Sequence, residues 1–190
     1  MAADKLKGKK VALLVAKGFE EVELTEPKKA LESAGAETEL VSIEKDKVRS
    51  WKFTDWGHEF AVDVHIADAR PEDYDALVLP GGVMNPDFLR MDDRAVKFVR
   101  AFAKSGKPIG AICHGPWTLV EADAVRGRRL TSYPSLRTDL GNAGANWIDA
   151  EVVVDKGLVT SRNPHDLPAF CRKLVEEVAE GRHDKRHAAE

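Results

Sequence analysis

The most constraining feature of the sequence is the alternation of short, uninterrupted apolar runs with segments whose apolar residues recur at helical spacing. Such runs are typical of strands in a parallel sheet, because helices cover both faces of the sheet and bury every residue. They predict strands at 11–16, 75–79 and 108–112, and a further strand is expected at 38–43. The sequence therefore predicts an α/β fold of three layers, in which helices cover both faces of a doubly wound, mostly parallel sheet.

Residues that commonly start and stop helices stand between these strands. We expect Pro27 and Gly35 to begin and end the first helix, and Asp92 or Asp93 to cap a helix that stops at Gly106. The last helix has the clearest pattern, because its apolar residues recur at i, i+3, i+4 and i+7: Leu167, Phe170, Cys171, Leu174, Val175 and Val178.

Two further segments predict antiparallel pairs. Aromatic residues and valines in 44–65 alternate with polar ones toward its end, which indicates a β-hairpin on an edge or face of the sheet. Residues 150–154 and 158–160 are expected to form a strand pair that turns at Lys156 and Gly157. Because no repeat or low-complexity segment divides the chain, we expect one domain over residues 1–190, of which 181–190 form a polar, frayed tail.

Composition excludes several classes of protein. Hydrophobic residues make up 43% and charged residues 32% of the chain, the balance of a globular protein. A net charge of −3 gives no electrostatic basis for a stable complex with nucleic acid. The apolar runs are too short to span a bilayer, and the run near the N-terminus is too short for an export signal. We therefore expect a cytoplasmic protein without membrane contact.

The two cysteines, Cys113 and Cys171, are too few for a disulfide framework or a four-cysteine zinc site. Cys171 lies on the apolar stripe of the last helix, so we expect it to serve packing. Cys113 follows the predicted strand 108–112, and Gly115 and Pro116 open the next helix. A cysteine on such a tight turn is an exposed nucleophile, and the N–H groups after it can stabilise a thiolate or an oxyanion. The alternative is a buried structural cysteine, against which the Gly-Pro pair argues.

Three segments expected at the same sheet edge carry unusual residues: Gly18-Phe-Glu-Glu-Val-Glu23, Pro80-Gly-Gly-Val-Met-Asn-Pro-Asp87, which follows Leu79 in the motif Leu79-Pro-Gly-Gly82, and Ala111-Ile-Cys-His-Gly-Pro-Trp117. Together they resemble the PfpI family of intracellular protease/amidases and general stress proteins. That family lies in the class I glutamine amidotransferase-like superfamily, which has a flavodoxin-like fold and includes the Parkinson-disease deglycase. Further matches at 131–134, 146–154 and 160–162 extend the resemblance over about 10–180.

The resemblance implies Cys113 as the nucleophile and His114 as its neighbouring general base, oriented by Asp87 from an adjacent subunit. Family members more often carry glutamate at the Asp87 position, and aspartate is shorter by one methylene. Glu23 matches the family's acidic residue that hydrogen-bonds the cysteine sulfur. Its carboxyl must be protonated to donate there, which requires a raised pKa. Glu20 is the competing assignment.

Other residues near the site follow from the same resemblance. The backbone N–H groups of Gly82 and His114 are the expected oxyanion donors. Tyr133 matches a family tyrosine near the cysteine and is expected to line the cleft. His165 either faces the site or is an exposed histidine at a helix start.

The remaining histidines suggest no chemistry. His58 and His65 lack ligand partners at metal spacing and are expected on the surface of edge strands. His183 and His187 are expected to be solvated in the tail. The sequence predicts no metal site and no cofactor.

Three functions use such a cysteine. The first is a stress-protective cysteine hydrolase of the protease/amidase type, acting on peptides or small amides. The second is a deglycase or glyoxalase that acts on methylglyoxal or glyoxal adducts of proteins and nucleic acids. The third is a non-catalytic redox sensor or chaperone whose cysteine is oxidised to sulfinic acid. A histidine directly after Cys113 favours catalysis, because a sensor needs no base.

The resemblance also implies self-association. Asp87 would complete the site of a neighbouring copy, so we expect at least a homodimer and in the larger case a hexamer. Val83, Met84 and Phe88 lie in a loop expected at 83–89, and exposed apolar residues there fit an interface.

Overall fold

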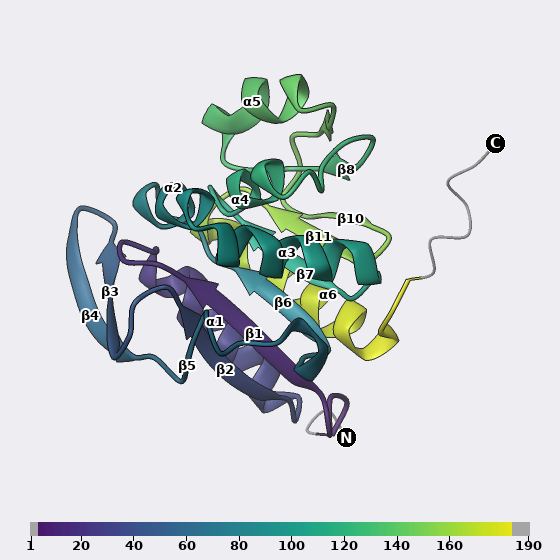
Figure 1. Ribbon diagram of the computed structural model, residues 1–190. Helices are drawn as coiled ribbons and strands as arrows, with labels where there is room; N and C mark the ends of the chain where they lie inside the picture. Colours follow the sequence, from purple (N-terminus) through teal and green to yellow (C-terminus); the bar gives the residue numbers. More distant parts are fainter. Residues whose placement is uncertain (1–3, 184–190) are drawn as a thin grey trace.

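The structure is a computed structural model that describes residues 4–183. Its centre is a seven-stranded sheet in the order β10-β11-β7-β6-β1-β2-β5 (Figure 1). Neighbouring strands pair in parallel except β10 and β11. The strands are β1 (Lys10–Val15), β2 (Glu37–Ser42), β5 (Val64–His65), β6 (Ala76–Leu79), β7 (Ile109–Ile112), β10 (Val153–Asp155) and β11 (Leu158–Ser161). The predicted α/β fold with a mostly parallel sheet is confirmed.

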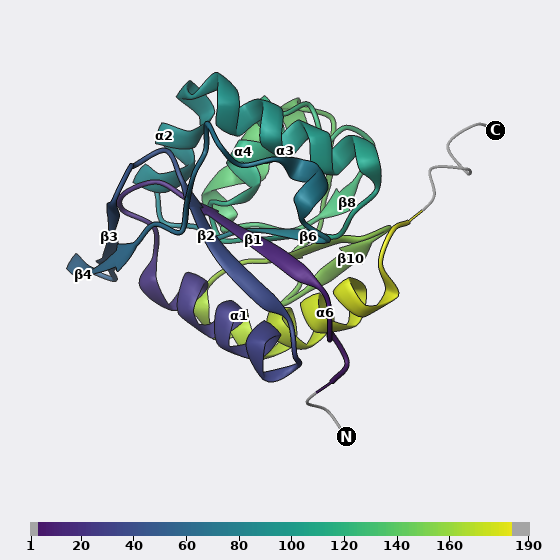
Figure 2. The same ribbon diagram turned by 60° about the horizontal axis from the view of Figure 1, so that its bottom comes forward.

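Helices cover both faces of this sheet, as Figure 2 shows. On one face lie α1 (Glu21–Ser33) and α6 (Leu167–Glu180), and on the other lie α2 (Met84–Met91), α3 (Asp93–Ser105) and α4 (Pro116–Glu121). Residues of β1 alternate between the two layers: Leu13 packs with the α1–α6 side and Leu14 with the α3–α4 side. Both are fully buried, which explains why this strand has a continuous apolar sequence.

Smaller elements complete the chain. A second pair of short strands, β8 (Arg129–Leu130) and β9 (Asn146–Trp147), flanks the helix α5 (Arg137–Asn142). Single 3-10 turns span Pro71–Asp73, Pro134–Leu136 and Pro164–Asp166. No helix in the described part of the chain has both the length and the apolar character that crossing a bilayer requires.

The predicted start of the first helix at Pro27 was wrong, because α1 begins at Glu21 and Pro27 lies inside it. Proline lacks an N–H group, so the carbonyl of Glu23 loses its helical partner. Burial of Glu23, Leu24 and Leu31 against the sheet outweighs this loss. The consequence is that Glu23 stands in the first turn of a helix rather than in a loop.

The cap of α3 is as expected. The Asp92 side chain accepts hydrogen bonds from the backbone N–H groups of Arg94 and Ala95. The helix ends before Gly106, whose φ of 72° is the left-handed conformation that glycine adopts readily. Of the two aspartates considered, Asp92 is therefore the cap.

The segment 83–89, expected as a loop, lies largely in α2. Its anchor is Asn85, which is fully buried. The Asn85 amide accepts the Ala16 N–H at 2.6 Å and donates to the carbonyls of Pro80 and Gly81. Because Val83 supplies no side-chain cap, the local sequence gives no signal for the start of this helix. Val83 is exposed as expected, whereas Met84 and Phe88 are half-buried.

The predicted hairpin is present as β3 (Lys47–Lys52) and β4 (Asp55–Ala61), which form a separate two-stranded sheet. It projects beyond the central sheet next to α2 (Figure 1). The Trp51 N–H donates to the carbonyl of Phe19, and the Gly18 N–H donates to the carbonyl of Arg49. These bonds attach the hairpin to the loop between β1 and α1.

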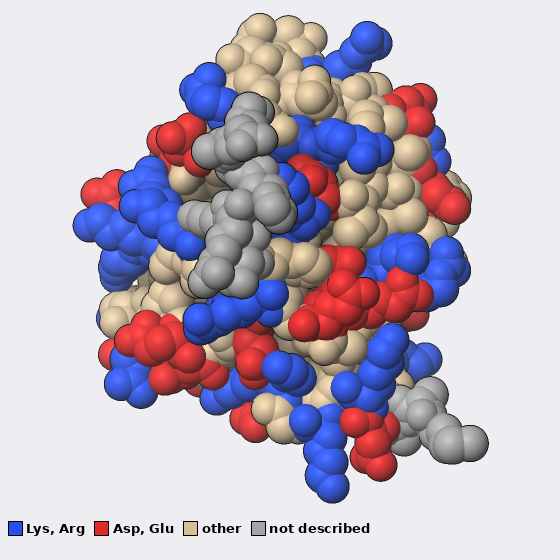
Figure 3. Space-filling view, turned by 90° about the vertical axis from the view of Figure 1, so that its right-hand side faces the viewer, with Lys and Arg blue, Asp and Glu red and all other residues tan. Residues whose placement is uncertain are grey.

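The end of the molecule away from the hairpin carries mixed charge. In Figure 3, blue lysine and arginine groups and red aspartate and glutamate groups are interspersed on the visible face. Neither sign dominates there, in keeping with the small net charge of −3.

Candidate active site

Cys113 lies at the turn between β7 and α4 with a φ of 60°, a left-handed conformation that is strained for a residue other than glycine. Neighbouring segments hold it there, since its N–H donates to the carbonyl of Ser161 and its carbonyl accepts from the N–H of Tyr133. A Cβ on Gly115 would lie 2.4 Å from the carbonyl oxygen of Leu79, so the turn requires glycine. Pro116 then occupies the first position of α4, where no N–H is needed.

Two backbone N–H groups donate hydrogen bonds to the Cys113 sulfur, those of Gly82 and His114. Gly82 has a φ of 79°, and a Cβ there would lie 2.4 Å from the carbonyl oxygen of Gly18. Only glycine therefore lets this backbone approach the loop before α1. The two predicted oxyanion donors thus converge on the sulfur.

Glu23 is fully buried beside the same sulfur. Its Oε2 accepts the Gly81 N–H at 2.8 Å. Burial raises the pKa of Glu23 to about 8 although the Gly81 N–H opposes this shift. The carboxyl is therefore mostly protonated at neutral pH and can donate a hydrogen bond to the sulfur.

Glu20 does not contact the sulfur. Its carboxylate accepts the N–H of Phe53 at 3.2 and 3.3 Å. The two glutamates differ because α1 begins at Glu21, which turns Glu23 inward from the first helical turn. The structure thus brings Glu23, rather than Glu20, to Cys113.

His114 lies beside the candidate nucleophile, with its Nδ1 3.1 Å from the Cys113 sulfur. Burial, followed by the charge of Glu23, raises the pKa of the Cys113 thiol, so the resting group is a thiol. Burial lowers the pKa of His114, which keeps the imidazole neutral at neutral pH. A neutral imidazole can accept the thiol proton.

The other side of His114 is held by residues that follow β8. Its Nε2 lies 3.3 Å from Oγ of Ser135. The ring stacks on Tyr133, with centroids 4.7 Å apart and an angle of 23° between the planes. The sequence did not indicate Ser135 as a site residue, because a serine after proline matches no functional motif. Only the tertiary fold brings it to His114.

Asp87 lies on the exposed side of α2. Within residues 4–183, no hydrogen bond or ion pair joins Asp87 to His114. Its expected role in the site of a neighbouring copy stays a prediction.

Cys113 and His114 border a cavity of about 660 Å³. Tyr133 and His165 also line it, and so do Trp51 and Phe53 of the hairpin. The sequence predicted the hairpin but did not indicate that its tip reaches the cavity. The lining residues are Gly18, Glu20, Glu23, Trp51, Phe53, Gly82, Val83, Met84, Cys113, His114, Tyr133, Asn163, Pro164 and His165.

Glu21 is a further titratable group with several polar contacts. Its carboxylate accepts hydrogen bonds from Ser50 Oγ at 2.6 Å and from the His58 N–H at 2.9 Å. Burial favours its neutral form, but these donors prevail and lower the pKa of Glu21 to about 2. His58 is exposed on β4, as expected, and its ring also pairs with Glu21 at 3.0 Å. Cys171 is half-buried on α6.

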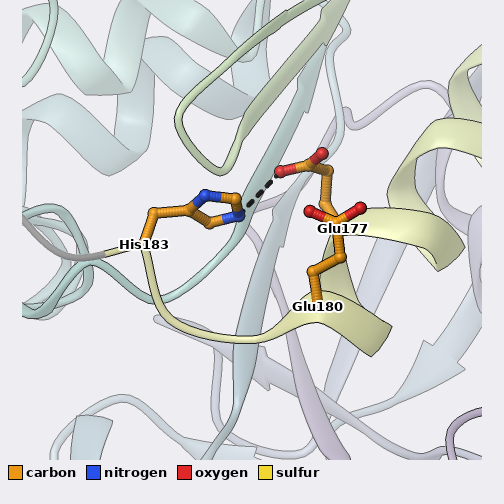
Figure 4. A group of neighbouring side chains, drawn as sticks. All are labelled: Glu177, Glu180 and His183. Carbon is orange, nitrogen blue, oxygen red and sulfur yellow. Dashed lines mark ion pairs between the residues drawn. The ribbon is translucent and has the colours of Figure 1, made fainter.

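The expectation of a solvated His183 was wrong. Its Nε2 lies 2.9 Å from Oε2 of Glu177, and Glu180 stands beside the pair (Figure 4). The His183 N–H also donates to the carbonyl of Gly106, so this histidine attaches the chain after α6 to the end of α3. This contact gives the buried carboxyl of Glu177 a polar neighbour. His187 lies outside the described residues.

Comparisons with known proteins agree with this geometry. A family model described as the DJ-1/PfpI family matches residues 9–177. The chain belongs to this family. The matched residues include Cys113, His114 and Glu23. The resemblance to this family that the sequence indicated is therefore confirmed.

Relatives in the DJ-1/PfpI family extend over nearly the whole chain. "General stress protein 18" of Bacillus subtilis is 49% identical over 169 residues, which cover 88% of this chain and 96% of the relative. The "Putative cysteine protease YraA" of the same organism is 47% identical over 167 residues, with the same two coverages. The crystal structure of Drosophila melanogaster DJ-1beta is similar with a TM-score of 0.81 and 29% identity, covering 90% of each chain.

Proposed function

We propose that this member of the DJ-1/PfpI family is a stress-protective cysteine hydrolase of the protease/amidase type, acting on peptides or small amides in the cytoplasm. The observation that carries the proposal is the contact between the Cys113 sulfur and Nδ1 of the neutral His114 imidazole, which lie 3.1 Å apart at the edge of a cavity. The backbone of Cys113 is strained at the turn that holds the sulfur there. The names of the two Bacillus subtilis relatives support it.

In the proposed reaction, His114 Nδ1 takes the thiol proton while the Cys113 sulfur attacks the amide carbon. The carbonyl π electrons move to oxygen, and the N–H groups of Gly82 and His114 stabilise this oxyanion. His114 then returns the proton to the departing amine, which leaves a thioester. Water, deprotonated by the same imidazole, cleaves the thioester to a carboxylic acid and restores the thiol.

Two further roles belong to this proposal. The neutral Glu23 carboxyl, which burial keeps mostly protonated, donates a hydrogen bond to the thiolate as it forms. Asp87 of a second copy orients His114 within a homodimer or a larger closed assembly.

One purified sample assayed against a fluorogenic peptide, an amide and methylglyoxal adducts tests the proposal. We expect turnover of the peptide or the amide, its loss in Cys113→Ala and its retention in Cys171→Ala. Turnover of the adducts alone would replace the protease/amidase assignment with a deglycase. Oxidation of Cys113 to sulfinic acid without turnover of any substrate would reject catalysis in favour of a redox sensor.

A further inference from the structure

Glu20 lies in the cavity but takes no part in the proposed hydrolysis. The residue is 8% exposed and borders the same cavity as Cys113. The Phe53 N–H donates to its two carboxylate oxygens over long distances of 3.3 Å to Oε1 and 3.2 Å to Oε2. No lysine, arginine or histidine within residues 4–183 forms an ion pair with it.

The lining of the cavity offers Glu20 no permanently charged partner. The lining contains no lysine or arginine. Burial keeps Glu23 mostly protonated and His114 neutral, so neither carries a full charge there. Burial also raises the pKa of Glu20, while the Phe53 N–H favours its ionised form. A cation bound beside this carboxylate would favour the ionised form further.

The hairpin adds aromatic rings to the same part of the cavity. Trp51 pairs with Glu20 in an isolated β-bridge, and Phe53 supplies the N–H that reaches the carboxylate. Both residues line the cavity, and Phe53 is 62% exposed. Aromatic faces attract ammonium and guanidinium groups through the ring quadrupole. A carboxylate that shares a cavity with two aromatic residues is a suitable environment for an organic cation.

This environment lies close to the reacting sulfur. A Cβ on Gly82 would lie 2.8 Å from the backbone nitrogen of Glu20, so the two backbones are in contact. The N–H of the same Gly82 donates to the Cys113 sulfur. A substrate that places its carbonyl at the sulfur can therefore reach Glu20 with a neighbouring group.

We propose that Glu20, with Trp51 and Phe53, forms a subsite for a positively charged group of the substrate, an ammonium or a guanidinium close to the amide that Cys113 attacks. This inference rests on the proposed hydrolase function and names its substrate class. The same charge disfavours substrates that carry a carboxylate at that position.

Charge-selective thiol reagents test the subsite without any need for turnover. The cationic aminoethyl and the anionic sulfonatoethyl methanethiosulfonate both transfer their thioalkyl group to the Cys113 thiolate, forming a disulfide and releasing methanesulfinate. Each rate at Cys113, followed by peptide mass mapping, is divided by the rate with free 2-mercaptoethanol. We expect the cationic reagent to be favoured by about tenfold, because one unscreened charge nearby has roughly that effect.

Glu20→Gln should abolish this preference while changing the rate with neutral methyl methanethiosulfonate less than about twofold, which also shows that the site is folded. Glu20→Asp keeps the charge and should keep a preference. Glu26→Gln, a change at an exposed position of α1, is the matched control and should behave as wild type. Equal normalised rates for the two charged reagents in the wild type, or an unchanged preference in Glu20→Gln, would overturn the subsite.

A substrate series separates this proposal from the hydrolase function and identifies the source of the charge. Amides with a blocked N-terminus and lysine, leucine or glutamate next to the scissile bond are compared with a leucine amide whose N-terminus is free. Preference for lysine assigns a side-chain cation, and preference for the free N-terminus assigns an α-ammonium group. Hydrolysis of all four at similar kcat/KM rejects the subsite alone. Charge-selective labelling without hydrolysis rejects the hydrolase alone.

Discussion

Replacing Glu23 by glutamine should change how the stability of the protein depends on pH. The folded state raises the pKa of Glu23 from 4.5 to about 8, chiefly through burial. Between these two values the folded protein holds a proton that the unfolded chain releases, so wild-type stability is greatest at low pH and falls as pH rises. This rise in the pKa lowers the free energy of unfolding by about 5 kcal/mol at pH values above the folded pKa, compared with its value at low pH.

Glutamine removes this titration and preserves the local contacts. Its carbonyl can accept the Gly81 N–H that now binds Oε2 at 2.8 Å, and its amide can donate to the sulfur as we propose for the protonated carboxyl. From pH 5 to pH 8 the unfolding equilibrium constant of the wild type, relative to that of Glu23→Gln, should rise by nearly tenfold per pH unit. Above pH 8 the difference should level off.

Urea unfolding of both proteins at unit steps from pH 5 to pH 9 measures this difference. Glu26→Gln again serves as the control, because it removes an exposed carboxylate from the same helix. Parallel pH profiles for the wild type and Glu23→Gln would refute the reasoning, since they would mean that Glu23 titrates alike in the folded and unfolded chains.

Three further outcomes follow from the geometry of the site. Gly115→Ala should lower the free energy of unfolding by about 2–4 kcal/mol, because the new Cβ would lie 2.4 Å from the Leu79 carbonyl oxygen. Gly141→Ala, where nothing lies within 4 Å, is its control in urea unfolding, and equal losses in the two variants would refute the clash. Ser135→Ala should slow alkylation of Cys113 by roughly three- to tenfold near neutral pH. In the wild type, Ser135 Oγ accepts from the Nε2–H of His114 and so fixes the tautomer that leaves Nδ1 free, and the alanine variant lacks this acceptor. Ser135→Thr should restore the rate, and an alanine variant with the wild-type pH profile would exclude this role. Light scattering should give a mass of at least twice 20.9 kDa at micromolar concentration, and a monomer would exclude a contribution of Asp87 from a second copy.

The sequence by itself determined the class of fold and the position of the tight turn that carries Cys113. Both depend on short-range physics: continuous apolar runs suit strands buried on both faces, and Gly115 with Pro116 specifies a tight turn into a helix. The Asp92 cap and the hairpin in 44–65 were likewise predictable, because a capping side chain and a strand turn act within a few residues.

Only the tertiary structure decided which side chains meet at Cys113. Burial of the first turn of α1 outweighed the local effect of Pro27, and this earlier start of the helix turned Glu23 toward the sulfur and left Glu20 at the hairpin. Ser135 reaches His114 from a segment 21 residues away. A parallel sheet brings distant strand ends to one edge, but the direction of each side chain there depends on the helix start and the loop path, which long-range packing selects.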